Sequence, residues 1–143
     1  MLAVLAASAL SALAAAPPAD RPPPPPDWSA QVRAAALERG AQAVFTYRAS
    51  SADAFDLRVT LRPLPRGLRF VRAASSPFRL VGGRPTWARE FPGRQTIVRS
   101  VRIAVRVEPG ASPGTRLCLT LRQVASNGGA PDVVPLRACS SVL

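Results

Sequence analysis

From about residue 42 onward, apolar residues recur at every second position, which is the spacing of strands with one buried face. The polar positions of these runs carry arginine. Clusters of glycine, proline and asparagine separate the runs and indicate turns. About seven short strands at this spacing predict an all-β fold, an antiparallel β-sandwich. The clearest runs are Phe55–Arg62, Val101–Val107 and Arg116–Arg122, and the shorter ones are Ala43–Arg48, Leu68–Arg72, Phe78–Val81 and Val133–Ser140.

The N-terminal segment, residues 1–16, is uncharged and consists almost entirely of alanine and leucine. Such a segment is typical of a signal peptide, because it is too short for a membrane span and Ala12 and Ala14 give an A-x-A cleavage pattern. We therefore expect an exported protein, periplasmic or extracellular, with no transmembrane span in the mature chain. No basic residue precedes the apolar run, so an alanine-rich disordered N-terminus or an uncleaved anchor is the alternative.

Two further segments precede the sandwich domain, which we expect at residues 42–143. Residues 17–27 form a proline-rich linker, since five consecutive prolines favour an extended polyproline rod; a proline-rich ligand for an aromatic groove is the less common alternative. Residues 28–41 form either a short helix or an extended lead-in segment. Asp27 is a candidate helix N-cap and Gly40 a candidate stop, but the segment has few large apolar residues.

The charge composition excludes most catalytic classes. The chain of 143 residues has 19 basic residues against 8 acidic ones, for a formal net charge of +11, and every basic residue is arginine. Without histidine or lysine, the chain has no imidazole base, no imidazole metal ligand and no Schiff-base amine. Asp53 and Asp56 are most simply a turn residue and a solvated strand position. We therefore expect no enzyme activity, no metal and no cofactor.

The two cysteines, Cys118 and Cys139, lie on either side of a turn signal at residues 126–129. A hairpin folded at that turn sets Cys118 opposite Cys139 and places both on its polar face. Directly opposed residues in an antiparallel pair are close enough for a disulfide, and thiols of exported proteins oxidise. The alternative is a reactive redox pair, since Arg116 and Arg137 flank the cysteines.

A candidate binding loop extends from Gly82 to Gly93, the longest stretch of the domain without alternation. Partners are often recognised by loops on a rigid scaffold. Most aromatic residues of a sandwich lie in its core, so core packing is the simpler role for the two aromatic residues of this stretch. The residues named for the loop are Trp87, Arg89, Phe91 and Arg94.

The region from residue 42 to 138 resembles the amino-terminal periplasmic domain of DsbD-type thiol:disulfide interchange proteins. The likeness lies in the strand Phe55–Arg62, the loop WAREFPGR from Trp87 to Arg94, the strand Thr96–Val107 and the segment LTLRQVASNGGAPDVVP, in which Gln123 matches a glutamine of the family. The resemblance implies an immunoglobulin-like sandwich in the cell envelope. It also places the family's two cysteines at or beside Ala125 and within residues 130–133, where this chain has none, which implies that electron transfer is lost.

These observations favour an exported, non-catalytic β-sandwich module that contains a disulfide and binds another cell-envelope component. The alternative is a periplasmic thiol:disulfide redox domain that uses Cys118 and Cys139. An envelope protein or an anionic polymer is the candidate partner. Nucleic acid is disfavoured, because the arginines are spread one or two per strand and no aromatic residues are interleaved with them.

Overall fold

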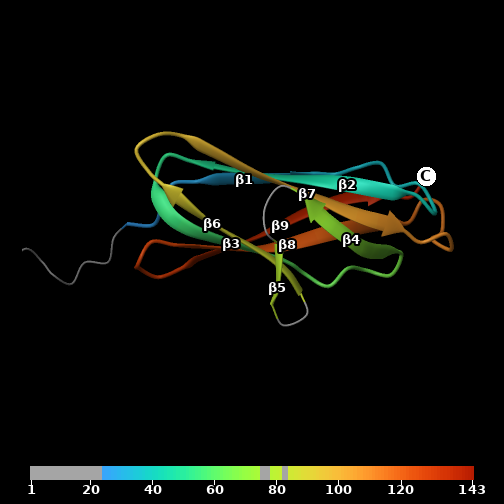
Figure 1. Ribbon diagram of the computed structural model, residues 1–143. Coiled ribbons are helices and arrows are strands. Elements are labelled where there is room, and N and C mark those ends of the chain that lie inside the picture. Colours follow the sequence, from blue (N-terminus) through green and yellow to red (C-terminus); the bar gives the residue numbers. More distant parts are fainter. Residues whose placement is uncertain (1–23, 75–77, 82–83) are drawn as a thin grey trace, which may run out of the picture.

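Two antiparallel β-sheets packed face to face form the protein (Figure 1). The computed structural model describes residues 24–74, 78–81 and 84–143, and within them all regular structure is strand. The predicted signal peptide lies outside the described residues, as does most of the proline-rich linker. The strands are β1 (Ser29–Arg33), β2 (Gln42–Ser51), β3 (Ala54–Leu61), β4 (Leu68–Ala74), β5 (Phe78–Val81), β6 (Arg84–Pro92), β7 (Ile97–Val107), β8 (Arg116–Ser126) and β9 (Asp132–Ser141).

One sheet has four strands in the order β1-β2-β7-β4, and the other has five in the order β5-β6-β3-β8-β9. The predicted fold class, an antiparallel immunoglobulin-like sandwich, is confirmed. All seven predicted strands are present, most of them a few residues longer than predicted. The remaining two strands, β1 and β6, are where the sequence-based predictions differ from the structure.

The alternation of apolar residues produces the core between the sheets. Every second side chain of β2, β3 and β8 is buried, and the intervening ones face solvent or are half-buried. β7 follows the same pattern from Val101 to Val107, except that the intervening Ala104 is also buried. Burying this many branched and aromatic side chains supplies most of the stabilisation of the fold, at about 1.5–3 kcal/mol for each large apolar side chain. The largest buried side chains are Trp87, Tyr47, Phe45, Phe91, Leu37, Leu57, Ile103, Leu119 and Leu121.

The helix alternative for residues 28–41 is wrong. Ser29–Arg33 forms β1, which pairs antiparallel with β2, and Leu37 is fully buried and forms a parallel bridge to Val142. The short alternation of Ala30 and Val32 turns apolar side chains toward the core, and sheet pairing outweighs the weak helix preference of the alanines. The sandwich therefore begins at Ser29 rather than at residue 42.

Hydrogen bonds fix the residues before β1 to the end of the sandwich. The Asp27 amide donates to Asp53 Oδ2 at 2.7 Å, and Ser51 Oγ donates to the Asp27 carbonyl at 2.6 Å. Trp28 Nε1 donates to Asp132 Oδ2 at 3.2 Å, so this segment reaches both sheets. Asp53 thus serves as a local structural acceptor, which agrees with its interpretation as a turn residue.

A buried hydrogen bond joins the two sheets. Tyr47 Oη on β2 donates to Gln123 Oε1 on β8 at 2.6 Å, and Gln123 Nε2 donates to the Val134 carbonyl at 3.3 Å. The Tyr47 ring also meets Trp87 edge to face, with ring centroids 5.4 Å apart. Because the hydroxyl is desolvated, burial raises the pKa of Tyr47 above its ordinary value.

Candidate functional site

The disulfide between Cys118 and Cys139 is present, in the register that the sequence predicts. Cys118 lies directly opposite Cys139, with Leu119 opposite Ala138 as the adjacent pair. Both cysteines are half-buried on the outer face of the five-stranded sheet. Arg137 Nη2 donates to Cys118 Sγ at 3.1 Å, so a guanidinium contacts one sulfur of the bond. Such a bond is consistent with an exported or extracellular domain.

The candidate binding loop is wrong as a loop, because most of it forms β6. This strand pairs with β3 from Ala54–Pro92 to Thr60–Thr86. Trp87 and Phe91 are each 1% exposed, so neither can contact a partner, and the core role that the sequence also allowed is the one they have. Phe91 stacks on Phe55 with ring centroids 4.7 Å apart.

The two arginines of the predicted loop lie apart from one another. Arg89 is half-buried on β6 and lies opposite Leu57, whereas Arg94 is exposed in the turn between β6 and β7. Arg94 has a positive φ of 75° and follows Gly93, whose φ is 83°. Two left-handed residues in succession make a tight turn, which explains the interruption of the alternation.

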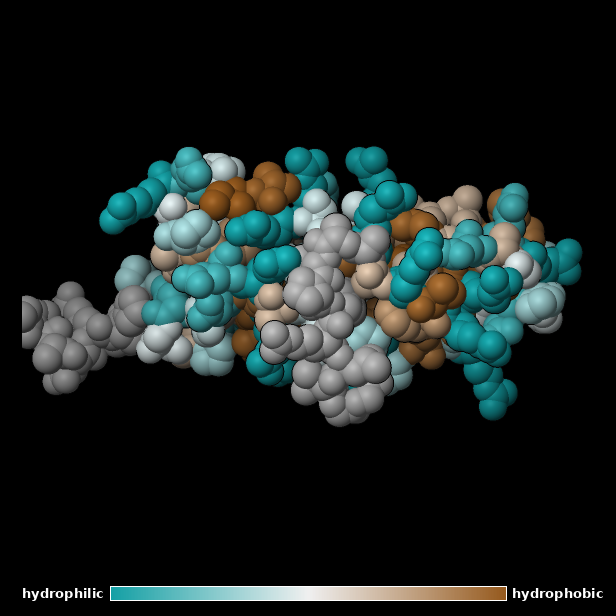
Figure 2. Space-filling view, in the orientation of Figure 1, coloured by the Kyte–Doolittle hydropathy of each residue, from teal (hydrophilic) through white to brown (hydrophobic). Residues whose placement is uncertain are grey.

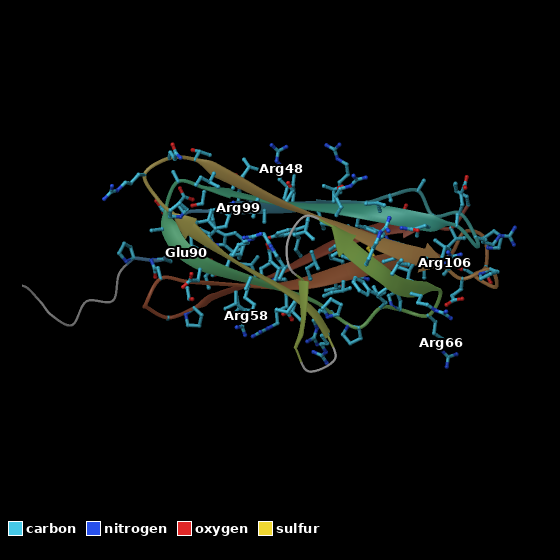
Figure 3. The ribbon with its side chains drawn as sticks, viewed as in Figure 1. Arg48, Arg58, Arg66, Glu90, Arg99 and Arg106 are labelled. Atoms are coloured by element: carbon cyan, nitrogen blue, oxygen red, sulfur yellow. A yellow bond between two sulfur atoms is a disulfide. The ribbon has the colours of Figure 1, made fainter. Side chains whose placement is uncertain are left out.

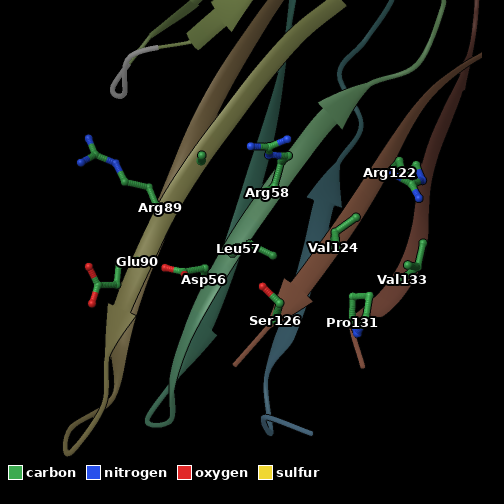
Figure 4. Close-up of a pocket in the computed structure, with 11 residues that line it drawn as sticks. Asp56, Leu57, Arg58, Arg89, Glu90, Arg122, Val124, Ser126, Pro131 and Val133 are labelled. Carbon is green, nitrogen blue, oxygen red and sulfur yellow. The ribbon is translucent and has the colours of Figure 1, made fainter. Parts of the chain in front are cut away.

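A groove of about 630 Å³ crosses the outer face of the five-stranded sheet (Figure 4). It extends from β6 across β3 and β8 to the start of β9, and its volume falls within the range of ligand-binding sites. Strand pairing sets its rows, since Arg58 lies opposite both Ala88 and Val124, and Val124 lies opposite Val133. This row therefore holds three apolar residues, Ala88, Val124 and Val133, together with Arg58, and Val133 is 46% exposed there.

Acidic and basic residues occupy different rows of this groove. Asp56 and Glu90 are directly opposed across β3 and β6, so two carboxylates lie side by side at one end. Arg58 lies in the next row, with Val124, and Arg122 lies one row further (Figure 4). Within the part of the chain that the structure describes, none of these four forms an ion pair. Two unpaired like charges across a strand pair are destabilising, which a partner of opposite charge would relieve.

Sequence reasoning missed the groove, although it placed Asp56 on the polar side of its strand. Glu90 was not recognised because residues 84–92 were interpreted as a loop, so no pairing placed it beside Asp56. The register of β3 with β6 is set by Phe55 opposite Phe91 and Val59 opposite Trp87. Pro85 and the inward-facing Arg89 interrupt the alternation of apolar and polar residues in β6. This alternation is the local sequence pattern that would have predicted a strand there.

Among the residues that the structure describes, no three side chains of histidine, cysteine, aspartate or glutamate gather where they could hold a metal ion. Within the same residues, no helix has the length and hydrophobicity needed to cross a membrane. What the groove offers is a set of apolar side chains beside two carboxylates and two guanidinium groups.

No protein-family model and no curated protein matches the sequence. Solved structures do match in fold. Two crystal structures of BcpA, the major pilin subunit of Bacillus cereus, have TM-scores of 0.60 and 0.57 at 11% and 12% identity, and the match covers 82% of this chain. This chain spans only 40% and 39% of the two pilin chains.

A third solved structure is similar along most of both chains. The non-cellulosomal cohesin from the hyperthermophilic archaeon Archaeoglobus fulgidus has a TM-score of 0.52 at 13% identity, covering 80% of this chain and 91% of the cohesin. At such low identities these likenesses concern the fold alone. They define the protein as an immunoglobulin-like β-sandwich domain with a cross-strand disulfide.

Proposed function

We propose that the protein is an exported, non-catalytic module that binds an extended segment of another cell-envelope protein in the groove of the five-stranded sheet. The groove is the observation that carries the proposal, because it combines apolar side chains with acidic and basic groups that have no ion-pair partner among the described residues. The similar solved structures, a pilin subunit and a cohesin, are not enzymes, which supports a binding role.

Export is supported by two independent features. Residues 1–16 have the composition of a signal peptide, and the two cysteines form a disulfide, which persists in oxidising compartments. If export occurs by cleavage at the A-x-A pattern, the mature protein begins at Ala15. An N-terminal mass measurement on the protein recovered outside the cytoplasm tests this.

The partner segment follows from the charges of the groove. A basic side chain of the partner would lie against Asp56 and Glu90, and an acidic one against Arg58 and Arg122. Between them, apolar side chains would cover Val124 and Val133. Charges arranged in this way set orientation and register more than affinity, while the apolar contacts supply affinity.

Site-specific photo-crosslinking in cells that export the protein tests the proposal. A photoreactive residue at Val133, in the groove, is compared with one at Val98 on the opposite sheet, since the two valines are 46% and 43% exposed. We expect one protein adduct from position 133 that is absent at position 98. Equal adducts from both positions, or none from position 133, would contradict the proposal.

A second candidate function, thiol:disulfide exchange, rests on the contact between Arg137 and Cys118. A guanidinium that donates to Cys118 Sγ stabilises a thiolate there, so Cys118 would be the leaving group. An incoming thiolate would then bond to Cys139 Sγ, and the electron pair of the broken S–S bond would remain on Cys118. The resemblance to DsbD-type proteins stays a prediction. It places the family's cysteines at or beside Ala125 and within residues 130–133, and in the structure Ala125 lies opposite Asp132 of that range.

Reduction by glutathione separates this candidate from a structural disulfide. If exchange is the function, the bond equilibrates with glutathione buffers and becomes harder to reduce in Arg137→Gln. A bond that stays oxidised in glutathione buffers excludes the redox function. In that case the disulfide only stabilises the hairpin of β8 and β9.

A further inference from the structure

The outer face of the four-stranded sheet carries arginines and no acidic residue on its strands. Its outward positions alternate with the buried ones of β1, β2, β4 and β7, and Figure 3 shows Arg48 on this side and Arg58 on the other. In Figure 2 polar side chains cover much of the visible surface. The exposed arginines of this face are Arg33, Arg48, Arg69, Arg72, Arg102 and Arg106, called here the arginine face.

Strand register orders these arginines into neighbouring rows. Arg69 lies opposite Arg106, Arg72 lies opposite Ala104, and Arg102 lies opposite Thr46, which in turn lies opposite Arg33. The next row holds Arg48 opposite Ser100. Rows on one face of a strand are about 6.8 Å apart, so the arginines form a stripe of roughly 20 Å.

Few partners among the described residues neutralise this stripe. Arg69 Nε lies 3.2 Å from Glu108 Oε1, just beyond β7, and Arg106 Nη1 donates to the Gly40 carbonyl at 3.3 Å. Among the described residues, Arg33, Arg48, Arg72 and Arg102 have no ion-pair or hydrogen-bond partner for their guanidinium groups. Like charges this close repel one another, and a polyanion would relieve the repulsion.

A depression of about 330 Å³ lies at one end of the stripe. Serine hydroxyls, an amide and a guanidinium surround it, and Val98 supplies one apolar contact. Ser29 Oγ and Ser50 Oγ lie 3.1 Å apart at its edge, so both hydroxyls point into the same region. The lining residues are Ser29, Ala30, Gln31, Arg48, Ser50 and Val98.

We propose that the arginine face binds an anionic polysaccharide, with one sugar unit in the depression and its acidic group at Arg48. Hydroxyl and amide side chains beside the arginines match a ligand that carries many hydroxyl groups as well as charge. The outward positions of these strands include no aromatic residue, which disfavours nucleic acid, because single strands bind by stacking on aromatic rings. This site lies on the sheet opposite to the groove and does not depend on the proposed function.

Two matched variants separate this site from general attraction to charge. The first replaces Arg33, Arg48, Arg72 and Arg102 of the arginine face by glutamine. The control replaces four exposed arginines of the other sheet or its loops by glutamine, so both variants remove four positive charges. The control positions are Arg62, Arg66, Arg84 and Arg116, all exposed, outside the groove and without an ion-pair partner among the described residues.

Binding to alginate, a uronic-acid polysaccharide, is measured with both variants at one ionic strength, with thermal unfolding as the check on folding. We expect the first variant to weaken binding at least tenfold, since several exposed charge contacts are lost together, and the control to change it less than about threefold. Equal losses in the two variants would show attraction to net charge only and would overturn the proposal.

A variant that leaves the charge unchanged tests the depression. Ser50→Leu fills it from β2 and removes the hydroxyl, so we expect about tenfold weaker binding to alginate and no change in binding to single-stranded DNA. If the unmodified protein binds single-stranded DNA or vesicles of anionic lipid as tightly as alginate, the assignment to a polysaccharide is wrong. It is equally wrong if Ser50→Leu leaves alginate binding unchanged.

Discussion

Tyr47 and Gln123 form a hydrogen bond of 2.6 Å across the core, and each residue comes from a different sheet. Both side chains are at most 1% exposed, so neither can exchange this partner for water. The pair fixes how β2 lies over β8 and therefore how the two outer faces are oriented. A buried polar pair of this kind costs more when one partner is lost than the bond itself contributes.

Replacement of one partner of this pair is expected to destabilise the protein. Tyr47→Phe leaves Gln123 Oε1 buried without its donor, and we expect the free energy of unfolding to fall by about 1–3 kcal/mol. Urea unfolding measures the change.

The double variant with Tyr47→Phe and Gln123→Leu is the control. We expect its loss in free energy of unfolding to be smaller than the sum of the losses of the two single variants. If the losses simply add, the bond is unimportant.

The pH dependence of stability isolates the same hydroxyl. The chain has one tyrosine, no histidine and no lysine, and both cysteines are in the disulfide, so Tyr47 is the only side chain whose ordinary pKa, the one it has in the unfolded chain, lies near 10. Because burial raises the pKa of Tyr47 above its ordinary value of 10.0, the folded state disfavours the phenolate. Its contribution is complete below pH 10 and is lost as the pH rises further, by about 1.4 kcal/mol per pH unit.

Denaturant unfolding at several pH values between 7 and 11.5 measures this effect. Tyr47→Phe is the control and should show no such decrease above pH 10. If the variant loses stability with the same slope as the unmodified protein, another process causes the decrease and the hydroxyl is not responsible.

Removal of the disulfide is expected to destabilise the domain by about 3 kcal/mol. Cys118 and Cys139 are 21 positions apart, and closing a loop of this length restricts the unfolded chain. Cys118→Ala with Cys139→Ala should therefore unfold at lower denaturant concentration than the oxidised protein. Reduction of the unmodified protein with a strong dithiol should give the same stability, and the same treatment should not affect the double variant.

Glycine at position 93 is expected to be required by the turn between β6 and β7. A Cβ there would lie 3.1 Å from the Ala54 amide nitrogen and 3.1 Å from the Ala54 Cβ, and φ is +83°. We expect Gly93→Ala to destabilise by at least about 1 kcal/mol. Gly110→Ala is the matched control, since a Cβ at that position meets no atom within 4 Å, and it should be close to neutral. Equal effects in thermal unfolding would contradict the assigned role of the turn.

The accuracy of the sequence-based predictions varied with the length of the pattern. β3, β7 and β8 alternate over long runs, so their existence, buried faces and the register between β8 and β9 were predictable. β1 was ambiguous because its alanines suit a helix as well as a strand, and only pairing with β2 decides between them. β6 was missed because Pro85 and the inward Arg89 interrupt its alternation.

The binding surfaces were less predictable than the fold, because they depend on which strands are neighbours. Asp56 and Glu90 are 34 positions apart in the sequence, and only the pairing of β3 with β6 brings them together. Likewise, the arginines were recognised as solvent-facing, but the order β1-β2-β7-β4 is what gathers six of them on one face. Local patterns contain no information on that order.

The groove is tested most directly by the crosslinking yield from a photoreactive residue at Ser126, which also lines it. Val133→Asp in the same chain places a charge on the apolar floor, whereas Val98→Asp places an equal charge on the opposite sheet. We predict that Val133→Asp abolishes the adduct with the envelope protein and that Val98→Asp leaves it unchanged. An adduct that survives Val133→Asp at full yield would contradict the proposed function.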